Sequence, residues 1–568
     1  MVRRHRGRVA LAAPLIALAL VAGGCSTGGS EGNDTTTAEL KTIDINPAAR
    51  DKIKQGGTVR WGINEFLSQY NRMHNDGNNA NLRTMDWGLM PQPFISDEKA
   101  AISPNPNFIT GVKEETDPKQ VITLTLNPKA KWSDGTEITW KDYASQAEAM
   151  SGRDTDYIVA QTTGWDRLES VERGKDDHEV VLTFKENYAD WRGLYDPLIP
   201  AEYSATPEKF NKGYLEDMPL TAGPFKFDGL DKTAKTATIS RDPNWWGEPA
   251  KLDKIIFRSM EDEALTGAFA NGELDVYDVG PNASAYKRVS SMQGIQLRTA
   301  ANPDFRHFTM NGESKKLSDA RVRNAMFMAI NREAIAQSDL KGLNWPSIPL
   351  NNHFFMNSQK GYKDNAGEFG KYNPEKAKQL LDQAGWTLPQ GKRVREKGGE
   401  PLELTFVIPT GIAISQQEGQ LAQAMLQEVG VKLNIEAVPS DDFFTKRIIP
   451  GNYDITPFSW IGTPFPVSGS EQQWSNAVEN KKGEKQWGNN LARVGADETD
   501  AAMAKAVAEL DPAKTIQYAN QADALIWKMG NTLPLYQRPK ITAVKANLAN
   551  LGANGFKFIK YEDIGYTS

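Results

Sequence analysis

Residues 402–437 read LELTFVIPTGIAISQQEGQLAQAMLQEVGVKLNIEA, in which two alternating apolar runs flank an amphipathic segment. Apolar and polar side chains alternate over 402–408 and again over 431–437, a pattern typical of β-strands. Between these runs apolar residues recur at helical spacing, and Gly430 follows where a helix would end. The expected inward face of the helix consists of Leu421, Ala424, Met425 and Val429. Strand, helix and strand with short connections form a βαβ unit, which predicts an α/β fold whose parallel strands are covered by helices.

Two further helices are marked by their ends. One is predicted to begin at Ser318, and its inward residues are Val322, Ala325, Met326, Ala329 and Ile330. The other is predicted to begin at Asn373-Pro374, because Asn caps helix N-termini and Pro suits the first helical position. It is expected to end at Gly385, with Ala377, Leu380, Leu381 and Ala384 facing inward.

The region from about 95 to 200 has a different pattern, with short strands separated by turns such as Ser133-Asp134-Gly135. Two of these strands alternate strictly, with inward residues Ile122, Leu124 and Leu126 in one and Val180, Leu182 and Phe184 in the other. The region is therefore predicted to be a small mixed α+β unit.

Composition limits the possible functions. The 568 residues predict two to four domains, because single cores stop growing near roughly 250–300 residues. The chain is 39% hydrophobic and 24% charged, as in soluble globular proteins, and its net charge is −6. A basic surface for nucleic acid is therefore not expected. The single cysteine excludes an intrachain disulfide and any multi-cysteine metal site.

The N-terminus has the pattern of a secretory signal peptide. The basic residues Arg3, Arg4, Arg6 and Arg8 precede an apolar run over 9–21, which is too short to span a bilayer permanently. Small residues then lead to Cys25, an arrangement that resembles the lipobox of bacterial lipoproteins, although Ala22 stands where Leu is usual. We expect residues 1–24 to be removed, Cys25 to carry lipid, and residues 25–48 to form a flexible tether.

Signatures of catalysis are missing from the sequence. The histidines that follow the signal peptide lie outside helical spacing of one another: they are His74, His178, His307 and His353. The sequence contains no His-Glu-x-x-His pair, no Gly-x-Ser-x-Gly turn and no phosphate-binding Gly-x-x-x-x-Gly-Lys loop. We therefore predict no enzyme activity, no cofactor and no metal site, with a secreted hydrolase as an alternative that would show turnover of a substrate.

A series of short motifs is distributed over most of the chain. In order they are Gly56–Val59, Lys131–Thr139, Ala222–Phe225, Asn244–Gly247, Ala270–Asp275, Leu317–Ala325 with Ala329–Ile335, Tyr372–Ala377, Ala384–Trp386, Gly451–Asp454 and Leu533–Tyr536. Together they resemble the solute-binding lipoproteins of ABC importers, in the oligopeptide and dipeptide class known as solute-binding family 5. The signal sequence and the Arg- and Trp-rich motifs are most similar to those of actinobacterial members.

The resemblance implies a two-lobed fold of the periplasmic-binding-protein type, in its large type II class with an extra subdomain. Mixed sheets would be covered by helices, and a cleft would lie between the lobes. Lobe I would comprise residues 49–94, 205–303 and 533–568, with residues 95–204 inserted as a subdomain, and lobe II would comprise 304–532. The hinge would close on the ligand, because only the closed form lets the ligand contact both lobes.

The resemblance also implies a binding segment. Peptide-binding members carry Trp-x-x-Asp, in which Trp packs on the peptide and Asp pairs with its free amine. The matching segment here is Trp460, Ile461, Gly462 and Thr463. Since Thr463 provides no charge, the ligand is a blocked, cyclic or non-peptide molecule, or another acid such as Asp454 or Asp441 takes over the amine.

Two other groups are candidate ligand-binding residues. Phe305, Arg306 and His307 would begin lobe II near the hinge, where Arg306 could meet a ligand carboxylate or form an internal salt bridge. Asn64, Phe66 and Tyr70 follow the first strand, and the carboxyl ends of strands face the cleft in α/β proteins.

The predicted function is capture of peptides at the outer face of the cell membrane and their delivery to an ABC permease. The expected partners are a peptide or other small solute, the permease subunits and the membrane through the lipid anchor, with a monomeric protein and no nucleic acid. Two alternatives remain open: a receptor for a glycan, a nickel chelate or a peptidoglycan fragment, and an envelope-assembly lipoprotein of the mannosylated-lipid type.

Overall fold

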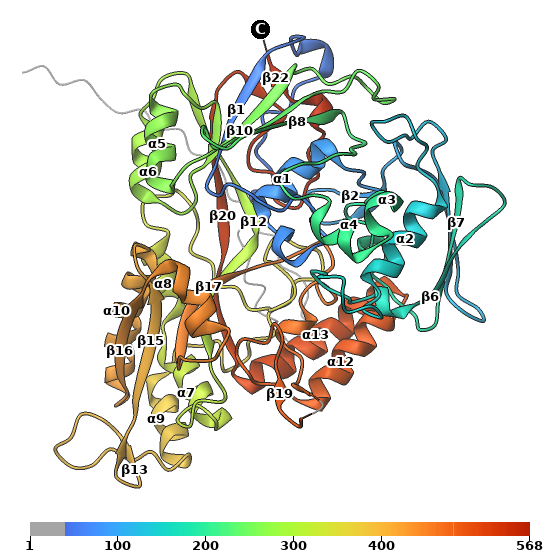
Figure 1. The fold of residues 1–568 in the computed structure, drawn as a ribbon. Helices are drawn as coiled ribbons and strands as arrows, with labels where there is room; N and C mark the ends of the chain where they lie inside the picture. Colours follow the sequence, from blue (N-terminus) through green and yellow to red (C-terminus); the bar gives the residue numbers. More distant parts are fainter. Residues whose placement is uncertain (1–39, 481, 568) are drawn as a thin grey trace, which may run out of the picture. The chain divides into compact units, whose positions relative to one another are not determined.

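A ten-stranded mixed sheet connects distant parts of the chain (Figure 1), in a computed structural model that describes residues 40–480 and 482–567. In spatial order its strands are β16 (Lys432–Val438), β15 (Glu403–Pro409), β17 (Ile455–Ile461), β12 (Ile295–Met310), β20 (Thr532–Lys545), β11 (Val276–Asp278), β1 (Thr58–Ile63), β10 (Lys254–Ser259), β9 (Thr236–Arg241) and β8 (Phe225–Asp231). In this order the C-terminal strand β20 lies between β12 and β11, two strands from the middle of the sequence.

Two long strands join the halves of this sheet. β12 has 16 residues and β20 has 14, and they run antiparallel to each other along most of their lengths. One end of β20 pairs with β11, whereas β12 pairs with β17 from Asp304 to Met310. The pairing of β12 with β20 is irregular between Ala301 and Phe305 and again between Arg306 and His307. The irregular segment therefore lies where the two halves of the sheet meet.

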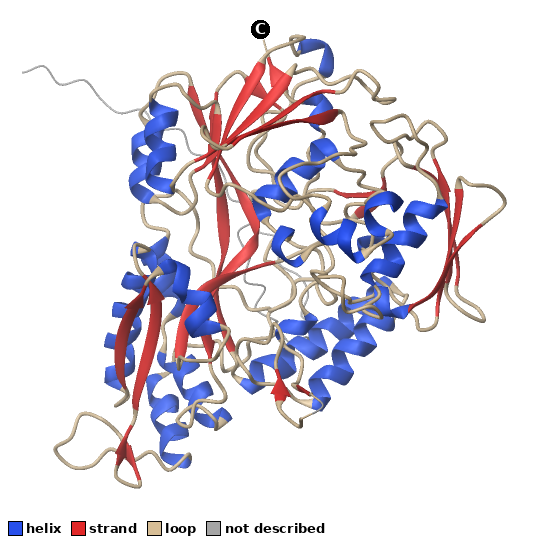
Figure 2. Ribbon diagram, viewed as in Figure 1, coloured by secondary structure: helices blue, strands red, loops and turns tan. Residues whose placement is uncertain are grey.

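The βαβ prediction for 402–437 is confirmed. β15 and β16 are parallel, with Glu403 opposite Lys432, and α10 (Ala413–Glu428) connects them. Helices flank these strands (Figure 2). The predicted inward face was partly wrong, because Ala424 is exposed. The buried residues of α10 are Ser415, Glu418, Gly419, Ala422 and Leu426. α10 packs closely on the sheet at Gly419, because a Cβ atom added there would lie only 3.2 Å from Phe406. The polar residues on the same side of the helix are therefore buried as well.

The two other predicted helices are present. α7 (Ala320–Ala329) begins two residues later than predicted, because Asp319 caps it by accepting a hydrogen bond from the backbone N–H of Arg321 at 2.8 Å. Its predicted inward residues are all buried. α9 (Pro374–Gln383) is capped by Asn373, which accepts from the backbone N–H of Lys376 at 3.0 Å.

A separate four-stranded antiparallel sheet forms the region predicted to be a small α+β unit. Its order is β4 (Ile109–Glu115), β5 (Val121–Leu126), β7 (Glu179–Phe184) and β6 (Leu168–Arg173). The predicted inward residues of β5 and β7 are at most 1% exposed, so the alternation is confirmed. α2 (Trp140–Met150) contacts this sheet, and Thr139 with Asp142 forms a capping box at its start.

Residues 40–48 correct the predicted tether. Leu40 and Ile45 are buried, and the backbone N–H of Asp44 donates to the carbonyl of Ala553 at 2.7 Å. The backbone N–H of Ala301 also donates to the carbonyl of Lys41. This segment therefore belongs to the folded body, because it has apolar anchors and backbone partners that a free linker lacks. The predicted signal peptide, Cys25 and the rest of the tether lie outside the described residues.

The remaining elements complete the architecture. The α-helices are α1 (Ala80–Leu89), α3 (Ala201–Ser204), α4 (Pro207–Lys212), α5 (Asp262–Ala270), α6 (Ala283–Ser290), α8 (Arg332–Asp339), α11 (Ser440–Asp442), α12 (Asp497–Ala508) and α13 (Pro512–Met529). The short 3-10 helices are η1 (Arg50–Lys52), η2 (Asn75–Gly77), η3 (Trp165–Arg167), η4 (Trp191–Gly193), η6 (Glu471–Gln473) and η7 (Tyr561–Asp563), and η5 (Phe443–Ile448) is a π-helix. The short strands are β2 (Phe94–Ser96), β3 (Ile102–Pro104), β13 (Glu396–Lys397), β14 (Glu400–Pro401), β18 (Val478–Glu479), β19 (Lys485–Gln486), β21 (Leu548–Ala549) and β22 (Gly565–Tyr566). In residues 40–480 and 482–567 every helix is too short or too polar to cross a membrane.

Candidate functional site

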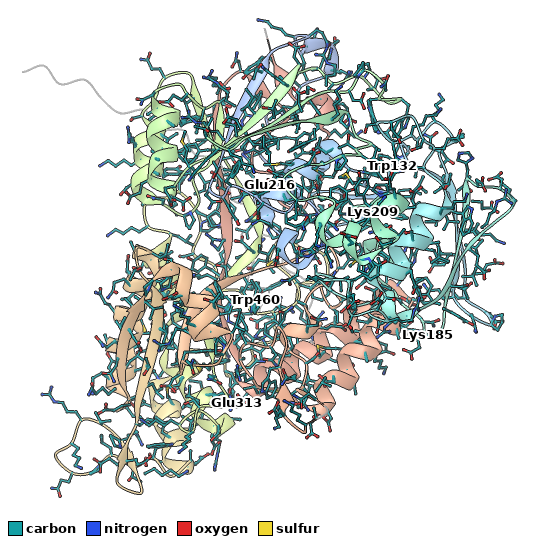
Figure 3. The ribbon with its side chains drawn as sticks, viewed as in Figure 1. Trp132, Lys185, Lys209, Glu216, Glu313 and Trp460 are labelled. Carbon is teal, nitrogen blue, oxygen red and sulfur yellow. The ribbon has the colours of Figure 1, made fainter. Side chains whose placement is uncertain are left out.

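An aromatic cluster forms where β17 ends beside β12, around Trp460 (labelled in Figure 3). The antiparallel register sets Phe305 opposite Trp460 and His307 opposite Phe458. The rings of His307 and Trp460 are nearly parallel, with centroids 5.8 Å apart, and Phe458 packs edge-on against both. Phe305 lies 5.5 Å from the His307 ring. The structure thus brings together three of the predicted site residues, and Trp460 remains half-buried.

His307 is an uncharged member of this cluster. Its side chain is fully buried, and its Nδ1 lies 3.1 Å from Oγ1 of Thr309. Burial lowers the pKa of His307 well below its ordinary value, and the positive charge of the neighbouring Arg306 lowers the pKa further. Nε2 has no hydrogen-bond partner among the described residues. At neutral pH His307 therefore acts as a neutral aromatic surface behind Trp460.

Arg306 forms an internal salt bridge, the role that the sequence left open beside contact with a ligand carboxylate. Its Nε lies 2.7 Å from Oε1 of Glu418, and its Nη2 lies 2.5 Å from Oε2 of the same residue. Nη2 also donates to Oγ of Ser415 at 2.8 Å. Both partners belong to the buried face of α10. Nε and Nη2 of the guanidinium thus form the internal ion pair that the sequence left as the alternative, and this pair fastens β12 to α10.

A second acid shares this buried site. Oδ2 of Asp339 on α8 accepts a hydrogen bond from the hydroxyl of Tyr536 at 3.1 Å. Burial, together with the negative charge of Glu418, raises the pKa of Asp339 to about 9. Asp339 therefore holds a proton at neutral pH, which removes the repulsion that two buried carboxylates would otherwise feel.

The candidates that follow the first strand have other surroundings. Oδ1 of Asn64 accepts from Nδ2 of Asn81 on α1 at 3.1 Å, and both groups are exposed. Tyr70 is buried against Phe227 of β8, with ring centroids 5.2 Å apart, and this burial raises the pKa of Tyr70. Phe66 is half-buried. The contacts of Asn64 and Tyr70 lie with α1 and β8 rather than with the aromatic cluster.

The segment after Trp460 forms a tight turn. Oγ1 of Thr463 accepts from the backbone N–H of Phe465 at 3.1 Å and donates to the carbonyl of Phe465 at 2.9 Å. The backbone N–H of Gly462 donates to the carbonyl of Pro303, and Ile461 is 56% exposed. The hydroxyl of Thr463 is therefore used within the turn, which positions the residues that come next.

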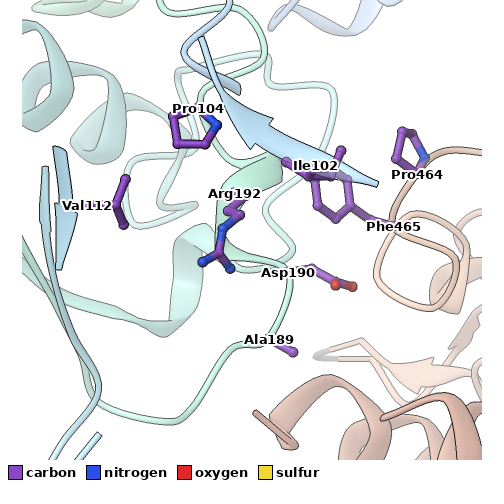
Figure 4. A pocket seen from close by; sticks show the side chains of 8 residues that line it. All are labelled: Ile102, Pro104, Val112, Ala189, Asp190, Arg192, Pro464 and Phe465. Carbon is purple, nitrogen blue, oxygen red and sulfur yellow. The ribbon is translucent and has the colours of Figure 1, made fainter. Parts of the chain in front are cut away.

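That turn faces a cavity of about 360 Å³. Pro464 and Phe465 form one side of it (Figure 4). The other lining residues come from the region of the four-stranded sheet: Ile102, Pro104, Val112, Ala189, Asp190 and Arg192. Ligand pockets measure roughly 300–1,000 Å³, so the space suits a small ligand or part of a longer one. Sequence reasoning missed these residues, although the run Asp190-Trp191-Arg192, with opposite charges beside a tryptophan, was visible.

Two acids were proposed to replace an aspartate at position 463, and the structure describes the side chain of one of them, Asp454. Oδ2 of Asp454 accepts from the backbone N–H of Thr405 at 2.7 Å, and its Oδ1 accepts from the hydroxyl of Ser314. Asp454 therefore fastens β15 and has a structural task. Asp441 belongs to α11, and its side chain lies outside the described ones. Across the described chain, no three His, Cys, Asp or Glu side chains are grouped so that they could hold a metal ion.

Comparison with known proteins adds the family context. Residues 103–482 match the family described as "Bacterial extracellular solute-binding proteins, family 5 Middle". The oligopeptide-binding protein OppA of Mycobacterium tuberculosis is 38% identical over 566 residues, covering 98% of this chain and 93% of the relative. OppA of Mycobacterium bovis matches to the same extent.

Solved structures show the same fold at lower sequence identity. The periplasmic EDTA-binding protein EppA superimposes with a TM-score of 0.83 at 22% identity, covering 94% of this chain and all of EppA. The oligopeptide-binding protein AppA from Bacillus subtilis, in complex with a nonapeptide, gives 0.76 at 19% identity, covering 91% of this chain and all of AppA. The predicted α/β, two-lobed binding-protein fold is thereby confirmed.

Proposed function

This chain belongs to family 5 of the bacterial extracellular solute-binding proteins, and we propose that it captures peptides outside the cytoplasm and passes them to an ABC permease. The observation that carries the proposal is the 38% identity to mycobacterial oligopeptide-binding proteins over nearly the whole chain. The family works by binding, so the peptide is released unaltered.

The proposed mechanism is closure of two lobes around the irregular segment of β12 and β20. Lobe I, residues 49–94, 205–303 and 533–568, would carry the subdomain 95–204, and lobe II would be residues 304–532. Asp304 and Arg538 form an ion pair of 2.5 Å beside this segment. A closed state gains ligand contacts that an open state lacks, so ligand shifts the population toward closure.

The aromatic cluster supports a binding role for Trp460. A half-buried indole backed by His307 and Phe458 offers a rigid apolar face with little entropy to lose when a ligand packs on it. Pro464 and Phe465, which follow in the same loop, face the cavity. The loop from Trp460 to Phe465 is therefore the segment of lobe II that we expect the peptide to contact.

Location and partners follow from the family and the N-terminal sequence. Family 5 proteins are extracytoplasmic, and we propose that the mature chain is monomeric and anchored to the membrane by lipid on Cys25. The permease subunits in that membrane would recognise the closed form.

Native mass spectrometry of the purified protein tests this function. We expect the protein to carry co-purified peptides of mixed sequence, which dissociate on activation in the gas phase and are identified by fragmentation. A single glycan, glycolipid or metal chelate in their place would contradict the proposal and favour one of the other solute classes.

A further inference from the structure

The cavity between Phe465 and the four-stranded sheet is lined by two charged side chains with different surroundings. Nη2 of Arg192 lies 3.3 Å from Oε2 of Glu114, and its guanidinium lies 4.2 Å from the centre of the Trp191 ring. The positive charge therefore already has an anion and an aromatic face. Asp190, in contrast, has Ser468 as its one hydrogen-bond donor among the described residues. This neutral residue donates from its Oγ at 2.6 Å and from its backbone.

Within the described part of the chain, Asp190 is a carboxylate without a counter-cation. Burial raises the pKa of Asp190, and the opposing influences come from Ser468 rather than from any positive group of the described residues. A second acid, Glu471, lies close enough to interact with Asp190. The pKa of Glu471 is raised to about 7, first by burial and in part by the charges of Asp166 and Asp190, whereas Arg167 lowers it. A half-buried carboxylate in such surroundings is costly unless a cation compensates it.

The position of Asp190 links two distant segments. Ser468 lies 278 residues further along the chain, in the loop that also supplies Pro464 and Phe465. The backbone N–H of the adjacent Ala189 donates to the carbonyl of Val507 at 2.8 Å, and Nε2 of Gln472 donates to Oγ1 of Thr163 at 3.2 Å. A cation bound at Asp190 would therefore contact both walls of the cavity.

The other walls show what surrounds that cation. Ile102, Pro104, Val112 and Phe465 are apolar, whereas the polar groups are concentrated at Asp190 and Arg192. An ammonium on a short aliphatic chain fits such a site, since the head pairs with the carboxylate and the chain packs on the walls. A metal ion would need several oxygen ligands, which this cavity does not gather.

We infer that Asp190 binds a primary ammonium group of the ligand in this cavity, and that it supplies the negative charge that Thr463 lacks. The inference rests on the proposed peptide-binding function and identifies a residue that determines its specificity. The ammonium comes from a free N-terminus or from a lysine side chain, and these sources are chemically alike at Asp190.

Isothermal titration calorimetry with three synthetic probes tests the inference. The probes are pentaalanine amide, its N-acetylated form, and the N-acetylated form with lysine at the central position. Wild-type protein should bind the free-amine probe about 10- to 100-fold more tightly than the acetylated alanine probe, as expected for a charge-assisted hydrogen bond. Recovery of affinity with the lysine probe would identify the side chain as a sufficient source, and no recovery would identify the N-terminus.

Matched variants assign the effect to Asp190. Asp190→Asn should abolish the preference for the free amine, Asp190→Glu should retain part of it, and Glu186→Gln, an equal charge change at an exposed position four residues away, should retain all of it. Thermal unfolding of each variant shows that it is folded. Equal wild-type affinity for the free and acetylated probes, or an unchanged preference in Asp190→Asn, would overturn the inference while leaving peptide binding intact. Failure of all three probes to bind the wild type would instead reject the proposed function, and the inference with it.

Discussion

Replacing Glu418 by glutamine would leave the Arg306 guanidinium buried without its anion. The carboxylate of Glu418 is fully buried and the Arg306 side chain is 9% exposed, so water can replace little of the lost interaction. Removing one partner of a buried pair costs about 3–5 kcal/mol. Because glutamine keeps one acceptor oxygen for the guanidinium, we expect a loss of unfolding free energy near the lower value, about 3 kcal/mol.

Urea unfolding followed by tryptophan fluorescence measures this loss. Glu428→Gln, at an exposed position of the same helix, is the control and should change the unfolding free energy by about 0.5 kcal/mol or less. Peptide affinity of Glu418→Gln should stay within about twofold of wild type, since the pair is structural. A loss below about 1 kcal/mol, or a peptide affinity that rises when Arg306 is freed, would refute the reasoning and return Arg306 to the binding site.

Three further predictions concern the aromatic cluster, the buried acids and the anchor. Trp460→Ala should weaken peptide binding by about 1–2 kcal/mol in calorimetry while Trp460→Phe loses less, and unchanged affinity would exclude Trp460 from the site. Burial raises the pKa of Asp339 in the folded state to about 9, whereas in the unfolded chain its pKa is near 4. Between about pH 4 and pH 9 the folded state therefore holds a proton that the unfolded chain has released. Asp339 thus makes the free energy of unfolding fall as pH rises through this window. Asp339→Asn should therefore flatten the slope of unfolding free energy against pH in that window, and an identical slope would contradict the assignment. Cys25→Ala should move the protein from the membrane fraction to the medium, and retention in the membrane would argue against lipid on Cys25.

Local patterns predicted the elements whose burial depends on their own sequence. The alternation at Leu404 and Phe406, the capping residue Asn373, and the inward residues of β5 all signal structure within a few positions. The inward face of α10 was mispredicted because Glu418 and Ser415 are buried to hold Arg306, a residue of another strand. Pattern reading places polar side chains outside, so a buried ion pair between distant segments has no local signal.

In the candidate site, too, the sequence indicated some residues and gave no local signal for others. Trp460 was singled out by its match to the family's binding segment, and Phe305 and His307 by their predicted place at the start of lobe II. Strand pairing brings these three residues together. Asp190 was not found, because its role depends on Ser468 and Phe465, which reach it only through the tertiary fold. The irregular segment of β12 was also missed, since the pairing of β12 with β20 joins residues more than two hundred positions apart in sequence.

Calorimetric titration of the purified wild-type protein with pentaalanine amide, followed by recovery of the probe and its mass analysis, tests the central claim most directly. The account predicts one bound molecule per chain, with a dissociation constant in the micromolar range or tighter, about −8 kcal/mol, and a probe recovered intact. Absence of heat at millimolar probe, or recovery of cleaved peptide, would contradict it.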